Sequence, residues 1–552
     1  MTQELTGYPS IDKPWLKYYS DEAINAEIPR KSIYEYVYEA NQDNRDSVAI
    51  NYYDYEITYG ELFDSVSRVT FALELLGVGK GDIVTICAVN SPEVIELIFA
   101  LNRISAVANL IYGTSNEKEI ITYLNNTNAE FVFVLDIFQD KFTDIRTKTD
   151  VKHIVVFGSL PVANGFTSWK EFMRDAELSA TFIKEPDITA IITYTGGTTG
   201  GSKGVMQSNY GIISNVWQYE KRDVVLKRDS KWLLCFPLFI GFGIFSLLIP
   251  MRCGMTLIIR NPLEESLSDL YTLYKPNYII NGPAWWEAFA DDDKEMDLSM
   301  LFEPMTGGDT LKLKVEEKIN KYLSKNSCDY KIINGYGMSE CGPGISFQNK
   351  NAYKYGSIGI PFVKVIVAAF DTETGNELKY DETGELCINT PSMMQGYLNN
   401  EDETLNVIRK HKDGKRWVHT GDLGYVTKDG FIYIVGRIKR YMLYITSKGV
   451  MKKVFSMDIE KVIDRFTGVE KTAVVSRNDS IRNQVPIAFV ILKENEDKAA
   501  VIENIRKYAD ENLDEEYRPI DYIVVDEFPL TKVGKVDYIE LEKRANIQGV
   551  EL

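Results

Sequence analysis

The sequence has few of the residues on which several common catalytic sites depend. It contains three histidines, His153, His411 and His419, among 552 residues. A histidine-centred metal site or a Ser-His-Asp triad needs at least one of them in the right place, and neither pattern is evident. The six cysteines are scattered, with no Cys-x-x-Cys pair. We interpret them as mostly buried thiols of a reducing compartment, not as a disulfide framework or a zinc site.

The chain also lacks an excess of positive charge and a long apolar run. Its formal net charge is −18, which argues against a nucleic-acid partner because such binding depends on clustered Lys and Arg. The longest apolar run, 236–251, is shorter than the ~20 residues of a typical membrane span and contains Gly and Pro. We expect a buried strand and turn there, beside a ligand pocket. The N-terminus has no apolar signal-peptide core, so we expect a cytoplasmic protein without a transmembrane segment.

Strand-like and helix-like segments alternate along the chain. Residues 82–89, 130–135 and 151–157 have the composition of strands, and residues 92–100 have the apolar spacing of a helix. This alternation predicts an α/β architecture with largely parallel sheets. After about residue 355, short strands separated by Gly- and Asp-rich turns predict a smaller β-rich subdomain. The tail from about residue 450 returns to mixed strands and helices.

A glycine-rich loop with a single lysine occupies residues 194–205, with the sequence YTGGTTGGSKGV. Glycine costs backbone entropy, so such a cluster needs a local reason, and close approach of backbone N–H groups to a phosphate is one. A flexible surface loop is the alternative. Residues 187–194 predict a strand, and Ser208 is expected to cap a helix running through Trp217, so we place the loop between a strand and a helix. The spacing departs from a P-loop, because Ser202 separates Gly201 from Lys203.

Taken with later segments, this loop resembles the core signature of the adenylate-forming superfamily, which includes acyl-CoA synthetases, adenylation domains of nonribosomal peptide synthetases and luciferases. The other family motifs follow in family order: ITYGEL, TGGDTL, NGYGMSE, GELCINTPSMMQGY, HTGDLG, GRIK and PLTKVGKVD. The resemblance covers nearly the full chain. It implies an α/β enzyme whose N-terminal region, 1–436, has two α/β subdomains and a small β-barrel-like subdomain. A mobile, smaller α+β C-terminal domain, 437–552, would follow the hinge at GRIK.

The resemblance also implies a reaction. A substrate carboxylate attacks the α-phosphate of ATP in the presence of Mg²⁺, pyrophosphate leaves, and the acyl adenylate then transfers its acyl group to the thiol of coenzyme A. Lys535 would bridge the carboxylate and the α-phosphate, and Ser339 would contact the α-phosphate. Glu340 would ligate Mg²⁺, and Lys439 would occupy the hinge position.

Further roles follow from the matched motifs. Nucleotide binding is implied for Thr195, Gly196, Gly197, Thr198, Thr199, Lys203, Gly307, Gly308, Asp309, Asn334, Gly335, Tyr336, Gly337, Asp422 and Arg437. Binding of the acyl substrate is implied for Ile240, Gly241, Phe242, Pro343 and Gly344, and we also assign Trp285 and Trp286 to this pocket. The segment 236–246 has no acidic residue to bind an α-amine, and an unpaired buried ammonium would be costly. We therefore expect a fatty or aryl acid, not an amino acid.

Two departures from the family pattern leave alternatives open. Ile240 stands where the family often has a histidine, and the segment after the hinge is longer than usual by about five residues. Because that segment contacts the incoming thiol in relatives, the acceptor is coenzyme A or the phosphopantetheine of an acyl carrier protein. A non-catalytic nucleotide-binding homologue is a third interpretation, against which the retained Lys203, Glu340, Asp422 and Lys535 argue.

Overall fold

The computed structural model describes residues 5–195, 202–222, 224, 226–260, 265–292, 294–493, 498–531 and 535–547. The chain forms two compact units. Unit 1 comprises Met1–Val367, Ile388–His419 and Thr427–Ile432, and unit 2 comprises Ala368–Cys387, Thr420–Val426 and Tyr433–Leu552. Within the described residues, no helix is both long and apolar enough to cross a lipid bilayer.

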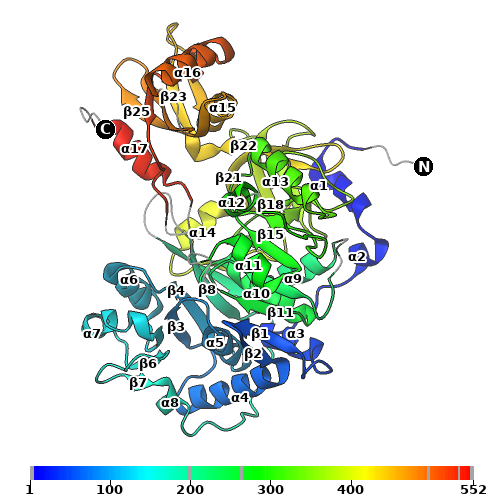
Figure 1. The fold of residues 1–552 in the computed structure, drawn as a ribbon, viewed down its shortest axis with the longest axis vertical. Helices are drawn as coiled ribbons and strands as arrows, with labels where there is room; N and C mark the ends of the chain where they lie inside the picture. The colour runs from blue at the N-terminus through cyan, green and yellow to red at the C-terminus, as the bar shows by residue number, and fades with distance from the viewer. Residues whose placement is uncertain are drawn as a thin grey trace. The chain divides into compact units, whose positions relative to one another are not determined.

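The first large sheet of unit 1 has a parallel centre. Its strands are β3 (Ile83–Ala88), β4 (Val107–Tyr112), β5 (Phe131–Leu135), β6 (His153–Phe157), β7 (Thr167–Ser168), β8 (Thr189–Thr195), β9 (Lys203–Ser208) and β19 (Gly396–Tyr397). Their order is β19-β9-β8-β4-β3-β5-β6-β7. Figure 1 labels β3, β4, β6, β7 and β8 of this sheet. Helix α5 (Pro92–Arg103) connects β3 to β4 in one direction, and α6 (Glu117–Thr127) leads back from β4 towards β5. Right-handed crossovers in opposite directions place helices on both faces of the sheet.

The second large sheet of unit 1 is also mixed. Its strands are β1 (Val48–Tyr52), β2 (Tyr55–Thr58), β10 (Lys231–Leu234), β11 (Thr256–Ile259), β12 (Tyr278–Asn281), β13 (Met305–Thr306), β14 (Ile333–Met338), β15 (Gly342–Phe347) and β16 (Ile360–Pro361). Their order is β16-β15-β14-β13-β12-β10-β11-β1-β2. The accompanying helices include α9 (Asn209–Glu220), α10 (Gly241–Cys253), α11 (Leu267–Tyr274), α12 (Pro283–Asp291) and α13 (Leu313–Lys325). Two such α/β layers match the expected N-terminal architecture.

A third sheet contains β17 (Ile366–Phe370), β18 (Gly384–Asn389), β20 (Ile408–Lys410), β21 (Arg416–Val426) and β22 (Ile432–Arg437). The boundaries between the units fall within β17, β18, β21 and β22. A fourth sheet, in unit 2, has β23 (Tyr441–Ile445), β24 (Met451–Phe455), β25 (Val469–Asp479), β26 (Asn483–Leu492) and β27 (Asp521–Val524). The helices of unit 2 are α15 (Ser456–Ile463), α16 (Lys498–Asn512) and α17 (Tyr538–Asn546). This mixture confirms the predicted smaller α+β domain.

Two local predictions were wrong. The apolar run at 236–251 forms most of helix α10, not a strand and turn. The glycine-rich loop is followed by strand β9, which pairs antiparallel with β8, so the loop joins two strands before the helix begins. The capping prediction was right, because the Ser208 side chain accepts a hydrogen bond from the Gly211 N–H at 3.0 Å at the start of α9.

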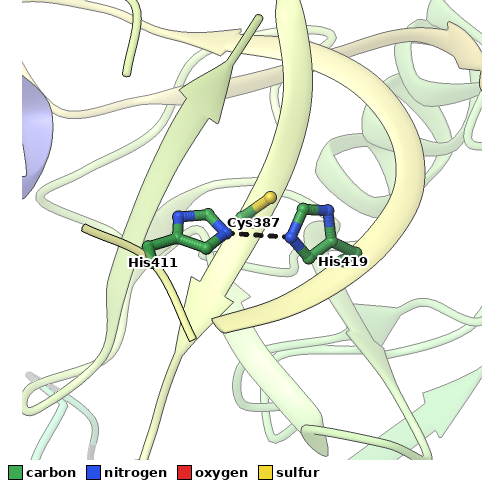
Figure 2. Close-up of side chains that lie close together, drawn as sticks. All are labelled: Cys387, His411 and His419. Atoms are coloured by element: carbon green, nitrogen blue, oxygen red, sulfur yellow. Dashed lines mark hydrogen bonds between the residues drawn. The ribbon is translucent and has the colours of Figure 1, made fainter. Parts of the chain in front are cut away.

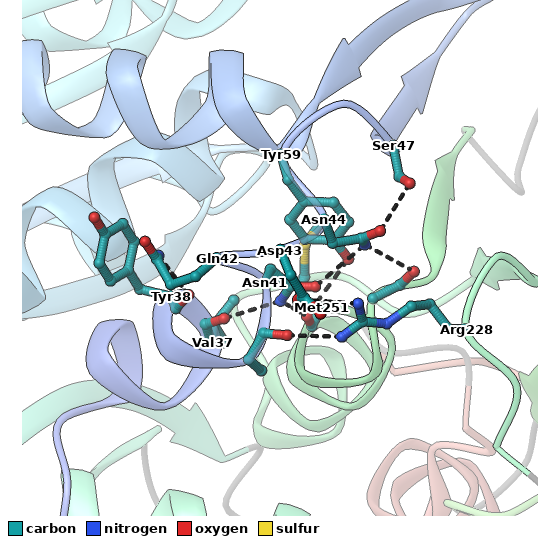
Figure 3. A network of polar contacts seen from close by, with 12 residues as sticks. Val37, Tyr38, Asn41, Gln42, Asp43, Asn44, Ser47, Tyr59, Arg228 and Met251 are labelled. Carbon is teal, nitrogen blue, oxygen red and sulfur yellow. Dashed lines mark hydrogen bonds and ion pairs between the residues drawn. The ribbon is translucent and has the colours of Figure 1, made fainter.

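The C-terminal end of α10 is closed by side chains from distant segments (Figure 3). Helix ends leave carbonyl groups without intrahelical partners. The Met251 carbonyl accepts from Asn41 Nδ2 at 2.8 Å and from the Tyr59 hydroxyl at 3.4 Å. Gly254, with φ of 72°, ends the helix in the left-handed region that favours glycine. These contacts hold α10 against the N-terminal part of unit 1, with its Gly241 end at the candidate site.

Candidate functional site

The β8–β9 hairpin carries the two ends of the glycine-rich loop. Thr195 lies opposite Lys203 in the antiparallel register. The backbone of Lys203 therefore belongs to a strand and is held by the hydrogen bonds between β8 and β9. Gly196, Gly197, Thr198 and Thr199 lie outside the residues that the structure describes.

Four side chains next to this hairpin form a cluster that we call the Tyr397 corner: Lys203, Glu340, Tyr397 and Glu403. Strand β19 pairs with β9, which places Tyr397 opposite Val205. Lys203 forms an ion pair with Glu403, and its Nζ lies 5.1 Å from the centroid of the Tyr397 ring. The Tyr397 hydroxyl donates to Glu340 Oε1 at 2.6 Å. The chain thus brings the predicted phosphate-binding lysine and the predicted metal ligand to one tyrosine.

The electrostatics of the corner hold Glu340 in place. Burial, and secondarily the nearby Glu340 carboxylate, raise the pKa of Tyr397 far above its ordinary value. The phenol therefore stays protonated and keeps donating to the carboxylate, which is 7% exposed. A carboxylate oriented in this way suits Mg²⁺, which prefers hard oxygen ligands. Tyr397 ends the GELCINTPSMMQGY motif, so its motif could have indicated a role, whereas nothing in the sequence indicated Glu403.

The TGGDTL and NGYGMSE motifs contain glycines because neighbouring atoms lie too close to leave room for a side chain. A Cβ on Gly307 would lie 3.2 Å from the Gly335 carbonyl oxygen. One on Gly337 would lie 2.1 Å from the Pro343 carbonyl oxygen, and one on Gly335 would meet the Phe347 ring at 2.4 Å. Only glycine fits these positions without a shift. The TGGDTL turn and strand β14 are thereby brought together, as the nucleotide-binding prediction requires.

The remaining nucleotide candidates of unit 1 differ in exposure. Tyr336 is half-buried on β14, and Gly308 and Asp309 are exposed in the turn. Asn334 is buried; its Nδ2 donates to the Ser357 carbonyl at 3.0 Å, and its backbone N–H donates to Gln348 Oε1. These contacts give Asn334 a structural function in holding β14, and its predicted nucleotide contact stays a prediction.

Unit 2 carries the other predicted polar residues. The Arg437 Nε donates to Asp422 Oδ1 at 2.7 Å, and Asp422 is buried. The backbone of Lys439 lies in the short 3₁₀ helix Ile438–Arg440. Lys535 is exposed, with its backbone N–H donating to Thr531 Oγ1 at 3.2 Å. Both residues were predicted from the sequence to bind nucleotide, but the ion pair between them was not predicted.

A cavity of about 30 Å³ lies in unit 1, and we call it the inner pocket. Of the predicted acyl-binding residues, Gly241 and Pro343 line it, whereas Ile240, Phe242 and Gly344 do not. The rest of the wall comes from β8, β9, α9, α10 and the segment after β14: Ile191, Thr193, Gln207, Gly211, Ile212, Asn215, Val216, Ile244, Phe245, Ser339 and Gly342. Trp286, which the sequence assigned to the acyl pocket, packs in the core, and its Nε1 donates to the Met305 carbonyl at 2.7 Å; it does not line the inner pocket.

Two of the three histidines lie together, although the sequence showed no such pattern. His411 Nε2 and His419 Nε2 are 2.9 Å apart, and Figure 2 draws them with Cys387 of β18. The β20–β21 hairpin pairs Arg409 with Trp417, which places both histidines on the same face of the hairpin as Trp417, and the His411 ring stacks on the Trp417 ring at 5.6 Å. Imidazole and thiolate are ligands that zinc accepts. No other such grouping of metal-ligating side chains is found among the residues described above.

Comparisons with known proteins agree with these motifs. The family model for AMP-binding enzymes matches residues 37–398, and the model for the C-terminal domain of AMP-binding enzymes matches residues 458–535. The long-chain-fatty-acid–CoA ligase of Bacillus subtilis (strain 168) is 25% identical over 565 residues, covering 95% of this chain and 96% of the relative. The 4-coumarate–CoA ligase 4 of Arabidopsis thaliana is 28% identical, covering 79% of this chain and 77% of the relative.

Solved structures show the same fold. An anthranilate CoA ligase in complex with anthranoyl-AMP superimposes with a TM-score of 0.82 at 22% identity, covering 95% of this chain and 99% of that one. The first family model alone spans most of the chain. The chain therefore belongs to the AMP-binding enzyme family, as a two-domain, AMP-forming member of the adenylate-forming superfamily.

Proposed function

We propose that the protein activates a carboxylic acid with ATP and Mg²⁺ to an acyl adenylate, and then transfers the acyl group to the thiol of coenzyme A. The observation that carries this proposal is the Tyr397 corner, where Glu340 and Lys203 converge on one side chain. A cation for phosphate and a ligand for Mg²⁺ are what a reaction at a crowded triphosphate needs. The CoA-ligase activities of the fatty-acid and 4-coumarate relatives support the choice of reaction.

Each residue has a separate part in this chemistry. Ser339, whose carbonyl is held by Gln207, presents its hydroxyl to the α-phosphate. Asp422 accepts the ribose hydroxyls, and the Arg437 beside it contacts the ribose or a phosphate. Lys535 bridges the carboxylate and the α-phosphate, which neutralises the charge that develops between two anions without any proton transfer.

The deciding experiment is carboxylate-dependent exchange of labelled pyrophosphate into ATP, with a panel of fatty and aryl acids. At least one acid should support exchange by the wild-type enzyme. Lys535→Ala should remove nearly all of it, because the substrate anions then repel each other unscreened. Lys543→Ala, which removes another lysine of unit 2 whose side chain is exposed on helix α17, serves as the matched control and should leave exchange unchanged. Full exchange by Lys535→Ala would refute the assignment.

The thiol step has its own test. Lys439→Pro in the hinge should leave adenylate formation intact and suppress thioester formation, because a fixed φ restricts the torsions on which domain rotation depends. Equal loss of both steps would contradict the hinge assignment.

A carrier-protein acceptor is the second candidate, and the hairpin β23–β24 favours it. Val450 in its turn and Met451 at the start of β24 are exposed, with 54% and 57% of their surfaces accessible. Apolar side chains on an exposed turn are suited to contact with another protein. A competition between free coenzyme A and a phosphopantetheinylated carrier protein decides between the acceptors, and acylation of coenzyme A alone would exclude the carrier.

A further inference from the structure

Two polar side chains of the β8–β9 hairpin face the inner pocket together. Ile191 lies directly opposite Gln207 in the antiparallel register, and Thr193 lies opposite Val205. Thr193 and Gln207 are therefore diagonal neighbours on one face of the hairpin. Both line the pocket, and they are 2% and 9% exposed.

The hydrogen bond made by the amide nitrogen of Gln207 fixes the orientation of its carboxamide. Its Nε2 donates to the Ser339 carbonyl at 2.6 Å. The flipped amide would place two acceptor oxygens against each other, so the carboxamide oxygen is the atom turned away from Ser339. That oxygen, Oε1, and the Thr193 Oγ1 are buried without a hydrogen-bond partner among the described residues.

The surroundings leave room for a ligand group at these two atoms. A Cβ on Gly211 would come within 3.2 Å of Gln207 Oε1, so glycine keeps the space beside that oxygen open. The neighbouring walls from Ile191, Ile244 and Phe245 are apolar. An unpaired polar group in such a setting is unfavourable unless a buried water molecule or a ligand group completes its hydrogen bonds, and a ligand donor can replace such a water.

We propose that the acid activated by this enzyme carries a hydroxyl or amino group in addition to its carboxylate, and that this group donates a hydrogen bond to Gln207 Oε1, with Thr193 Oγ1 as the second partner. The inference rests on the proposed function and names its substrate class. An amide oxygen accepts only, so it recognises a donor and repels a second carboxylate. The cavity of about 30 Å³ has room for a group the size of one or two water molecules, which suits the hydroxyl or amino group itself.

Matched pairs of acids test this inference in the pyrophosphate-exchange assay. Each pair shares a carbon skeleton and differs by one hydroxyl or amino group, as hydroxylated and unsubstituted aryl acids do. For at least one pair, kcat/KM should favour the substituted acid by about tenfold or more, since a site with an unmet acceptor rejects the analogue that lacks the donor. Gln207→Leu should reduce that preference to less than about threefold.

The controls separate recognition from folding. Gln218 is fully buried on α9, its amide atoms also lack partners among the described residues, and it does not line the pocket. Gln218→Leu should therefore keep the wild-type preference. If Gln207→Leu does not fold, Thr193→Val, which preserves the side-chain shape, provides the second variant and should weaken the same preference.

The possible results distinguish failure of this inference from failure of the proposed function. Equal exchange with both members of every pair overturns the inference and leaves the proposed function standing, as does a preference that survives both pocket variants. Exchange with none of the acids overturns the proposed function, and this inference with it.

Discussion

The Tyr397 corner and the inner pocket flank the same hairpin, yet they satisfy their polar groups in opposite ways. In the corner, Lys203 is paired with Glu403, and Glu340 accepts from Tyr397. In the pocket, Gln207 Oε1 and Thr193 Oγ1 are buried without a partner among the described residues. The polar groups of the corner are paired with one another, whereas the two acceptors of the pocket are, in our proposal, completed by the acid. Substitutions in the corner should therefore cost stability and activity together, and substitutions in the pocket should separate them.

The largest effect is expected at the metal ligand of the corner. Glu340→Gln removes the charge that Mg²⁺ requires and should lower pyrophosphate exchange by about 10²–10³-fold, with a higher Mg²⁺ requirement. Exchange rates measured across a Mg²⁺ titration test this. Glu171→Gln, at an exposed surface carboxylate of unit 1 that pairs with Arg174, is the matched control. An unchanged Mg²⁺ dependence would show that the corner does not bind the metal.

The second-largest effect is expected from removing the Tyr397 hydroxyl, which donates to the Glu340 carboxylate. Tyr397→Phe leaves Glu340 buried without its donor and should lower the free energy of unfolding by about 3 kcal/mol, because a buried charged acceptor loses a charge-assisted bond. Urea denaturation measures the change. Tyr55→Phe, at a tyrosine that is 67% exposed, should have no effect. A stability equal to that of the wild type would mean that the corner is not held by its own contacts.

Glu96 on α5 offers a carboxylate that is buried but has no part in either region. Burial, and secondarily Glu93, raise the pKa of Glu96 to about 7 from its ordinary 4.5, against a hydrogen bond from Ser65. The folded state therefore binds this proton more tightly than the unfolded state. Its contribution to stability is complete below about pH 4.5 and is lost as the pH rises towards about 7.

Glu96→Gln should remove this dependence. Relative to the wild type, the variant should gain about 2 kcal/mol of unfolding free energy between about pH 5 and 8. Denaturation curves at several pH values provide the measurement. Parallel pH profiles of variant and wild type would show that Glu96 is solvated in the folded protein.

The smallest effect is expected in the pocket, and it has the opposite sign to that of Tyr397→Phe. Thr193→Val replaces an unpaired buried hydroxyl with a methyl group of similar shape and should raise the unfolding free energy by about 0.5–1 kcal/mol. Thr70→Val is the matched control, because the Thr70 hydroxyl is buried but donates to the Val66 carbonyl at 2.7 Å, and its loss should destabilise. Destabilisation by Thr193→Val would show that its hydroxyl is already satisfied.

The sequence predicted the family and the fold class, because short motifs keep their order whatever their surroundings. Its assignment of the nucleotide-binding residues stays a prediction. Strands β3, β5 and β6 and helix α5 were predicted within a few residues, since their apolar patterns are local. Helix α10 was missed because it is apolar on all sides and contains Gly and Pro, which favoured a strand and a turn. A Cβ at Gly243 would lie 2.0 Å from the Pro237 carbonyl oxygen, so that glycine serves packing and not a turn.

The contacts that define the site were beyond sequence reasoning for a different reason. Tyr397 reaches Glu340 because β19 pairs with β9, almost two hundred residues earlier in the chain. The Gln207 amide meets Ser339 across a sequence separation of 132 residues. Contacts between residues so far apart produce no periodic pattern in the sequence. Only the folded structure therefore shows that these motifs contact one another.

The Gln207 amide joins two tasks that enzymes commonly assign to different residues. Its Nε2 donates to the backbone carbonyl of Ser339, the serine expected at the nucleotide, and its Oε1 is the atom that we propose for recognition of the acid. Substrate selectivity and turnover would therefore depend on the same side chain. A design that replaces Gln207 to admit a new acid must also supply another hydrogen-bond donor to the Ser339 carbonyl. New preferences should accordingly evolve first at Thr193, which lines the pocket but whose hydroxyl makes no hydrogen bond to Ser339 or to any other described residue.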